Sequence, residues 1–193
     1  MIKLLFNPFE KYSEKTLATF GIIATIIGTL LGLVFNGIYD GILDMHPVKD
    51  ISVTEIIYSL VTNFLIIGII LFMLGKIINP KTRFIDVLST IMIAKIPLYL
   101  LTFTNINGFN YELGLEIQSK LILNQMNNFS GLLLSKLILI TILSLIVLVW
   151  TISLLYNGFK TATNIKSHKH ILLFIISLII AEVISKIAIS NFL

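Results

Sequence analysis

Five long apolar stretches limit what this chain can fold into more than any other feature of its sequence. An α-helix of about 20 residues crosses the apolar core of a bilayer, and each stretch reaches that length. The sequence therefore predicts an all-α polytopic membrane protein with five transmembrane helices. The predicted spans are residues 16–39, 56–75, 84–103, 131–156 and 171–193.

The composition agrees with a chain embedded in lipid. Charged residues make up 12% of the sequence and hydrophobic residues 56%, whereas a soluble domain carries about 25% charged residues. We expect residues 16–193 to form a single transmembrane domain, preceded by an interfacial segment at residues 1–15. The sequence contains no cysteine, which excludes disulfides and thiol chemistry.

Basic residues alternate between the predicted connections and so predict the orientation of the chain. Lys and Arg number three in the N-terminal segment, three in the second loop and three in the fourth, but one in each of the other two loops. By the positive-inside rule, the N-terminus is predicted to be cytoplasmic and the C-terminus outside. This surplus orients the protein and contacts anionic lipid, so it does not indicate nucleic-acid binding.

The third loop is predicted to contain a helix of a different kind, because its apolar residues recur at helical spacing on one side only. Leu113, Ile117, Leu121 and Met126 follow this pattern within residues 112–126. Such one-sided spacing predicts an amphipathic helix that lies on the membrane surface.

Three charged side chains, Lys95, Glu182 and Lys186, lie well inside the third and last predicted spans. The spans that carry Lys95 and Glu182 both enter the membrane from the cytoplasmic side. Counted from that side, the two residues lie about 13 and 18 Å deep, near the middle of the bilayer. Glu182 and Lys186 are one helical turn apart and share a face. We expect Lys95 and Glu182 to pair, directly or through one water, because an unpaired charge at that depth is costly. Pro97, two residues after Lys95, predicts a kink in the third helix.

This intramembrane charge cluster of Lys95, Glu182 and Lys186 has two interpretations. It can be an ion pair or triad that packs the helical bundle, or it can form a path for protons or ions. One acid among five spans is sparse for a proton relay, which favours the structural interpretation. The sequence shows no paired carboxylates, Ser-His-Asp set or phosphate-binding loop, so we predict that the protein is not an enzyme.

Two glycines of the first span, Gly28 and Gly32, form a small-xxx-small pair that permits close contact between helices. The pair can serve packing within one chain or dimerisation of two chains. We favour packing within the chain.

The first loop places Asp40, Asp44 and His46 close together in the sequence DGILDMH. Carboxylate oxygens and an imidazole nitrogen are suitable ligands for a divalent cation. The spacing matches no established metal motif, and the loop also holds Asp50 and Glu55. We therefore expect an ordinary acidic loop, with no metal or other cofactor.

A family resemblance is carried by three segments: NPFEKYSEKT before the first span, KTRFIDVLSTIMIAKIPLYLL at the third, and VWTISLLYNGFKTATNIKSHKHILLF before the last. They resemble the Yip-one family (Ypt/Rab-interacting membrane proteins), and in particular its bacterial branch. The resemblance implies five helices, a cytoplasmic N-terminus and an outer C-terminus. Eukaryotic members are linked to Rab GTPases and vesicle traffic. Their long N-terminal region with an Asp-Leu-Tyr-Gly-Pro motif is not in this sequence, so no GTPase-binding role is expected.

The resemblance and the hydropathy together predict a multi-pass protein of the bacterial inner membrane. Its predicted function is that of a non-enzymatic, Yip-like protein that organises the membrane or binds partners. The alternative is a small transporter or channel that uses Lys95, Glu182 and Lys186. The expected partners are the lipid bilayer and either other membrane proteins or further copies of the chain.

Overall fold

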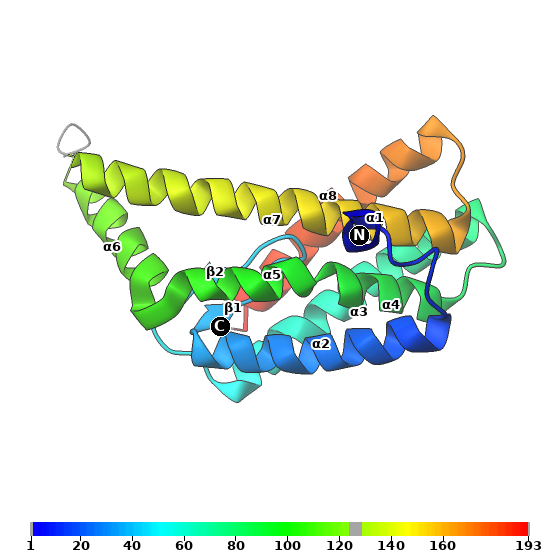
Figure 1. Cartoon of the computed structure of the whole chain (residues 1–193), viewed down its shortest axis with the longest axis horizontal. Helices are drawn as coiled ribbons and strands as arrows, with labels where there is room; N and C mark the ends of the chain where they lie inside the picture. The colour runs from blue at the N-terminus through cyan, green and yellow to red at the C-terminus, as the bar shows by residue number, and fades with distance from the viewer. Residues whose placement is uncertain (1, 124–128, 193) are drawn as a thin grey trace.

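The computed structural model describes residues 2–123 and 129–192, and most of these residues are helical (Figure 1). Within them, five helical segments are long and apolar enough to cross a membrane, which confirms the predicted all-α polytopic fold. The segments are α2 (Glu14–Val34), α3 (Val53–Ile78), the run that opens with α4 (Phe84–Ala94), α7 (Gly131–Thr163) and α8 (His168–Ser190).

The third segment is interrupted at Lys95, the charged residue that the sequence places in the middle of the third span. α4 ends at Ala94 and α5 (Ile96–Leu101) follows directly, with Lys95 between them and Pro97 in the first turn of α5. Proline is tolerated in a first turn because the N–H that it lacks has no partner within the helix there. The chain thus changes helix at Lys95, near the middle of the bundle.

A 3₁₀ segment, η1 (Thr102–Gly108), separates α5 from α6 (Phe109–Ile122). Asn107 and Gly108 adopt left-handed backbone angles there, which turn the chain toward the start of α7 (Figure 1). α6 is the helix predicted within residues 112–126, although it begins earlier, and residue 126 lies outside the described part of the chain. Its position on the membrane surface stays a prediction.

Several helix ends differ from the predicted ones because local side chains set them. α2 ends at Val34 rather than at residue 39, since Asn36 takes a left-handed conformation and a hairpin follows. α3 begins at Val53, where Ser52 and Glu55 form a capping box. α7 continues past residue 156 to Thr163 and ends at Asn164, whose left-handed conformation terminates the helix.

The central element is α4, which contacts α2, α3 and α7, while α3 also packs along α8. Val87 and Ile91 of α4 are completely buried in this core. The outward faces of the other spans expose large apolar side chains, as expected for surfaces that meet lipid. A short N-terminal helix, α1 (Ile2–Phe6), lies against α7, where the Trp150 indole N–H donates to the carbonyl of Leu5 at 2.7 Å.

The connection between α2 and α3 is a small antiparallel hairpin of β1 (Gly37–Ile38) and β2 (His46–Pro47). We call residues 39–45, which join the two strands, the inserted loop. Tyr39, Ile42 and Met45 of this loop are buried in the interior of the bundle. The expected ordinary outer loop is therefore a packed structural element.

Candidate functional site

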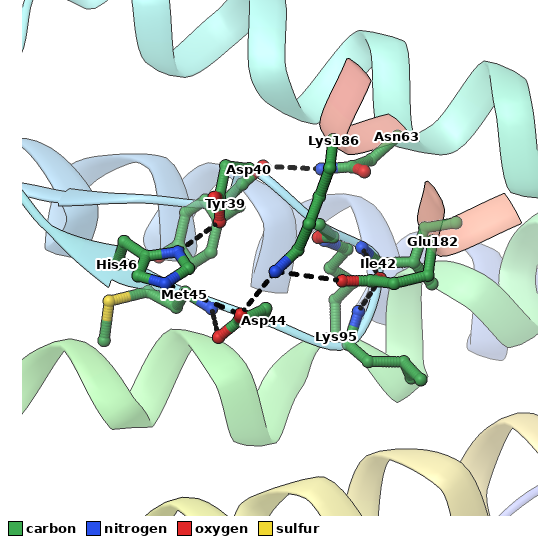
Figure 2. A network of polar contacts seen from close by, with 12 residues as sticks. Tyr39, Asp40, Ile42, Asp44, Met45, His46, Asn63, Lys95, Glu182 and Lys186 are labelled. Carbon is green, nitrogen blue, oxygen red and sulfur yellow. Dashed lines mark hydrogen bonds and ion pairs between the residues drawn. The ribbon is translucent and has the colours of Figure 1, made fainter. Parts of the chain in front are cut away.

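The charged residues of the third and last spans converge on the inserted loop (Figure 2). Lys95 comes from the junction of α4 and α5, and Glu182 and Lys186 come from α8. The loop approaches them from the hairpin end of the bundle. The fold thus brings Glu182 within hydrogen-bond distance of loop residues that are more than 130 positions away in the sequence.

The side chain of Lys95 binds a backbone carbonyl of the inserted loop. Only 2% of Lys95 is exposed, and its ammonium Nζ donates to the carbonyl oxygen of Gly41 at 2.9 Å. Nζ also lies 5.7 Å from the centre of the Tyr39 ring, a favourable position for a cation. The ammonium therefore has its polar and aromatic partners on the inserted loop.

The Glu182 carboxylate binds the two backbone N–H groups that come directly after Gly41 in the loop. Its Oε2 accepts hydrogen bonds from the backbone N–H groups of Ile42 at 2.6 Å and Leu43 at 2.9 Å. Non-helical backbone at membrane depth is tolerated only where protein groups satisfy its hydrogen bonds. Lys95 and Glu182 supply those bonds, one as the donor and the other as the acceptor.

The loop backbone lies between Lys95 and Glu182, the two charges expected to pair. In the described part of the chain no direct ion pair joins them; they bind the carbonyl and the amides of consecutive loop residues. Their matching depths arise because both contact the same short segment. The added Cβ of an alanine at Gly41 would overlap the Glu182 carboxylate, so this close approach depends on glycine.

Lys186 extends the network toward the end of the bundle. Its Nζ lies 2.8 Å from Oδ2 of Asp44 and 3.6 Å from Oε1 of Glu182. It thus bridges the half-buried Glu182 carboxylate to the more exposed Asp44 of the loop, and Figure 2 shows it between the two. The three residues of the predicted charge cluster all reach the loop, whereas the sequence pattern related them only to one another.

The candidate metal ligands lie at the outer edge of this network. The ligand atoms of Asp40, Asp44 and His46 lie within 4.8 Å of one another, and Nδ1 of His46 is 2.8 Å from Oδ1 of Asp40. The hydrogen bond to Asp40 raises the pKa of His46. Burial would raise the pKa of Asp40, but the hydrogen bond and charge of His46 and the charge of Lys186 lower it. The acids already have the His46 ring and the Lys186 ammonium as partners.

Tyr39 fixes the base of the loop. It is completely buried, its hydroxyl donates to the carbonyl of Gly28 at 2.8 Å, and its ring meets that of Tyr99 edge-on at 5.2 Å. The side-chain amide of Asn63 in α3 donates to the Tyr39 carbonyl at 2.6 Å. Groups from three helices therefore hold a loop whose sequence alone does not place it between them.

The two predicted packing glycines lie beside this arrangement. Gly28 faces the ring of Tyr99 in α5, and Gly32 faces the side chain of Ile56 in α3 and the carbonyl of Gly37. These contacts are within one chain, and α2 approaches α5 closely where its glycine leaves room for the ring.

A groove with a volume of about 410 Å³ adjoins the network, between α5, α7 and α8. Asp44 and Glu182 lie at its polar side together with Thr141 and Ser144 of α7. Its other walls are apolar, formed by leucine and isoleucine side chains. The site therefore combines a fixed polar network with a lipid-depth groove that can accommodate another apolar chain.

Comparison with known families shows which family the chain belongs to. The profile of the Yip1 domain matches residues 2–188, nearly the whole chain. The chain belongs to the Yip1 family. No curated protein and no solved structure matches it. This Yip1-family protein is thus a membrane-spanning chain in which buried charges hold an inserted loop.

The sequence predicted the intramembrane charges of this Yip1-family chain but not that they bind the backbone of the inserted loop. The loop mixes buried Tyr39, Ile42 and Met45 with Asp40 and Asp44, so it shows neither helical nor strand periodicity. One signal was present: three large apolar residues in a short acidic connection are more than a solvated loop needs.

Proposed function

We propose that this Yip1-family chain is a non-enzymatic protein of the bacterial inner membrane that organises the membrane by binding a helix of a partner protein. The observation that supports this is the use of the buried charges. Lys95 and Glu182 bind the backbone of the inserted loop, and the loop in turn contributes Leu43 and Asp44 to the groove beside α7. The charges act as supports for a binding surface.

The groove has the properties of a site for a transmembrane helix. Its walls are apolar, and Ser144 and Thr141 offer hydroxyl groups of the kind that join helices in lipid. The carboxylates beside them are held by Lys186 and by loop amides, so the surface is preorganised. A helix with small and polar residues on one face fits this combination.

A photoreactive residue at Ser144 should therefore crosslink to a specific protein in native membranes, because this position lines the groove. The same residue at Ile142 is the matched control, since that side chain is on the same helix but is not among the groove-lining residues and is about half exposed. Crosslinked products are compared by mass and identified by peptide sequencing. Identical products at both positions would contradict a binding site in the groove.

The transport alternative is tested separately, because Asp44 and Glu182 line the same groove. Purified protein in vesicles should show no proton or cation flux that disappears in Glu182→Gln. Lys136→Met, which changes a charge away from the groove, controls for a general effect of mutation. Flux that depends on Glu182 would replace the present proposal with a transporter.

The proposed orientation places the hairpin and α6 outside and the α3–α4 and α7–α8 connections in the cytoplasm. Single cysteines at Lys49 and Gln118 should react with an impermeant thiol reagent in intact cells, while cysteines at Lys81 and Lys169 should react only after lysis. All four positions are exposed, so access depends on the side of the membrane alone. The reverse labelling pattern would invert the orientation.

A further inference from the structure

A second polar cavity lies at the other end of the bundle, where α2 and α4 begin and α7 approaches its end. Its volume is about 250 Å³, and its polar lining includes Glu14, Arg83, Asp86 and Ser89. Because the ends of three spanning segments meet here, the cavity lies where the apolar core of the bilayer gives way to the headgroups. The inserted loop and its charges are at the opposite ends of α2 and α8.

The charges at this cavity are unequal. Nη2 of Arg83 lies 2.7 Å from Oε2 of Glu14 and 2.9 Å from Oδ1 of Asp86. Among the residues that line the cavity, one cation thus faces two carboxylates, a formal charge of −1. A positively charged group is favoured in the remaining space.

Ser89 supplies the observation that points to a ligand. It is 2% exposed and lines the cavity, yet its Oγ has no hydrogen-bond partner within the described residues. A buried hydroxyl without a partner costs free energy, so a ligand donor at this position is favourable. The neighbouring hydroxyl of Thr90 is already used, since it donates to the carbonyl of Asp86.

Aromatic side chains complete the cavity. Phe9 and Tyr12 line it, and the Tyr12 ring already has the ammonium of Lys11 at 5.5 Å from its centre. Carboxylates, an accepting hydroxyl and aromatic rings are together the groups that bind an ammonium. Arg83 at the rim is exposed and offers guanidinium N–H groups to an adjacent phosphate.

We propose that this cavity binds the primary ammonium of a phospholipid headgroup of the ethanolamine type. The ammonium contacts the Glu14 and Asp86 carboxylates beside Nη2 of Arg83, which already bridges them, and donates to Oγ of Ser89, while the lipid phosphate faces Arg83. Pockets for drug-sized ligands are about 300–1,000 Å³, so this smaller cavity takes a headgroup and leaves the acyl chains in the bilayer. A trimethylated ammonium has no N–H for Ser89, and a phosphoglycerol headgroup has no cation for the carboxylates.

Native mass spectrometry of the full-length protein in detergent tests the proposal. Phosphatidylethanolamine, phosphatidylcholine and phosphatidylglycerol with identical acyl chains are titrated in parallel. Phosphatidylethanolamine should bind about tenfold more tightly than the other two lipids, as expected for the added charge-assisted hydrogen bonds. Glycerophosphoethanolamine, which carries the headgroup without chains, should bind much more weakly because it lacks the apolar contacts of a lipid.

Ser89→Ala and Glu14→Gln should each weaken phosphatidylethanolamine binding by about tenfold. Ser144→Ala, which removes a hydroxyl from the other groove, should leave it unchanged. Thermal unfolding without lipid shows whether each variant is folded, and Ser89→Ala, which removes a single unpaired oxygen, tests the site even if Glu14→Gln does not fold. Equal binding of the three lipids, unchanged binding in Ser89→Ala, or tightest binding of phosphatidylglycerol overturns the proposal. Equally tight binding of glycerophosphoethanolamine overturns the lipid as the source of the ammonium.

Discussion

Lys95→Met and Glu182→Leu should each lower the free energy of unfolding of the detergent-solubilised protein by about 3–5 kcal/mol, as expected when one member of a buried charged network is removed. Lys95→Met leaves the Gly41 carbonyl without its donor, and Glu182→Leu leaves the Ile42 and Leu43 amides without their acceptor. Each variant also leaves the remaining charge in a low-dielectric interior. Chemical or thermal unfolding followed by far-UV circular dichroism measures the loss.

The double variant should lose less than the sum of the two single losses, with a coupling of about 0.5–3 kcal/mol. Both side chains bind the same loop, so once the first substitution has released it, the second has little left to disrupt. Gly41→Ala reaches the same released state independently, because the added Cβ would overlap the Glu182 carboxylate. Hydrogen exchange at residues 39–45 should rise in all of these variants.

Lys136→Met is the matched control for loss of a lysine from a spanning helix. Lys136 lies near the start of α7, where its ammonium is 5.4 Å from the centre of the Phe109 ring in α6, and it does not line the groove beside the inserted loop. Its removal should cost no more than about 1 kcal/mol. Strictly additive losses for Lys95 and Glu182, with unchanged exchange in the loop, would mean that the two residues do not act through it.

The spans could be predicted from the sequence because hydropathy acts over about 20 residues and does not depend on tertiary contacts. The depths of Lys95 and Glu182 follow from the same geometry, since a helix rises by about 1.5 Å per residue. Helix ends were less predictable. Asn36 and Asn164 end α2 and α7 by adopting left-handed conformations, which a local polar residue permits but does not require.

The contacts of the site could not be predicted because they join parts of the chain that sequence periodicity does not relate. Glu182 binds the amides of residues 42 and 43, and Lys95 binds the carbonyl of residue 41. Charge depth indicated that Lys95 and Glu182 need partners, and the nearest charged residue was the natural choice. Backbone groups are equally good partners for a charge, and they leave no trace in the sequence.

Gly28→Ala should lower the free energy of unfolding by about 1–3 kcal/mol, although alanine is the better helix former. The added Cβ would overlap the Tyr99 ring, and that ring has little freedom to move because it is buried and contacts Tyr39 edge-on. The overlap should also weaken the hydrogen bond from the Tyr39 hydroxyl to the Gly28 carbonyl. The inserted loop then loses its base, which is measured as a lower unfolding temperature in detergent.

Gly114→Ala in α6 is the matched control, because within the described residues no atom outside its own helical turn lies within 4 Å of the new Cβ. It should leave stability unchanged or raise it by about 0.5–1 kcal/mol through helix propensity alone. Light scattering of both variants separates the two interpretations of the glycine pair. If Gly28→Ala keeps its unfolding temperature while a dimer of the parent protein dissociates, the glycine serves contact between two chains. A loss of stability with the oligomeric state unchanged places its role in the packing of α2 against Tyr99 and the loop.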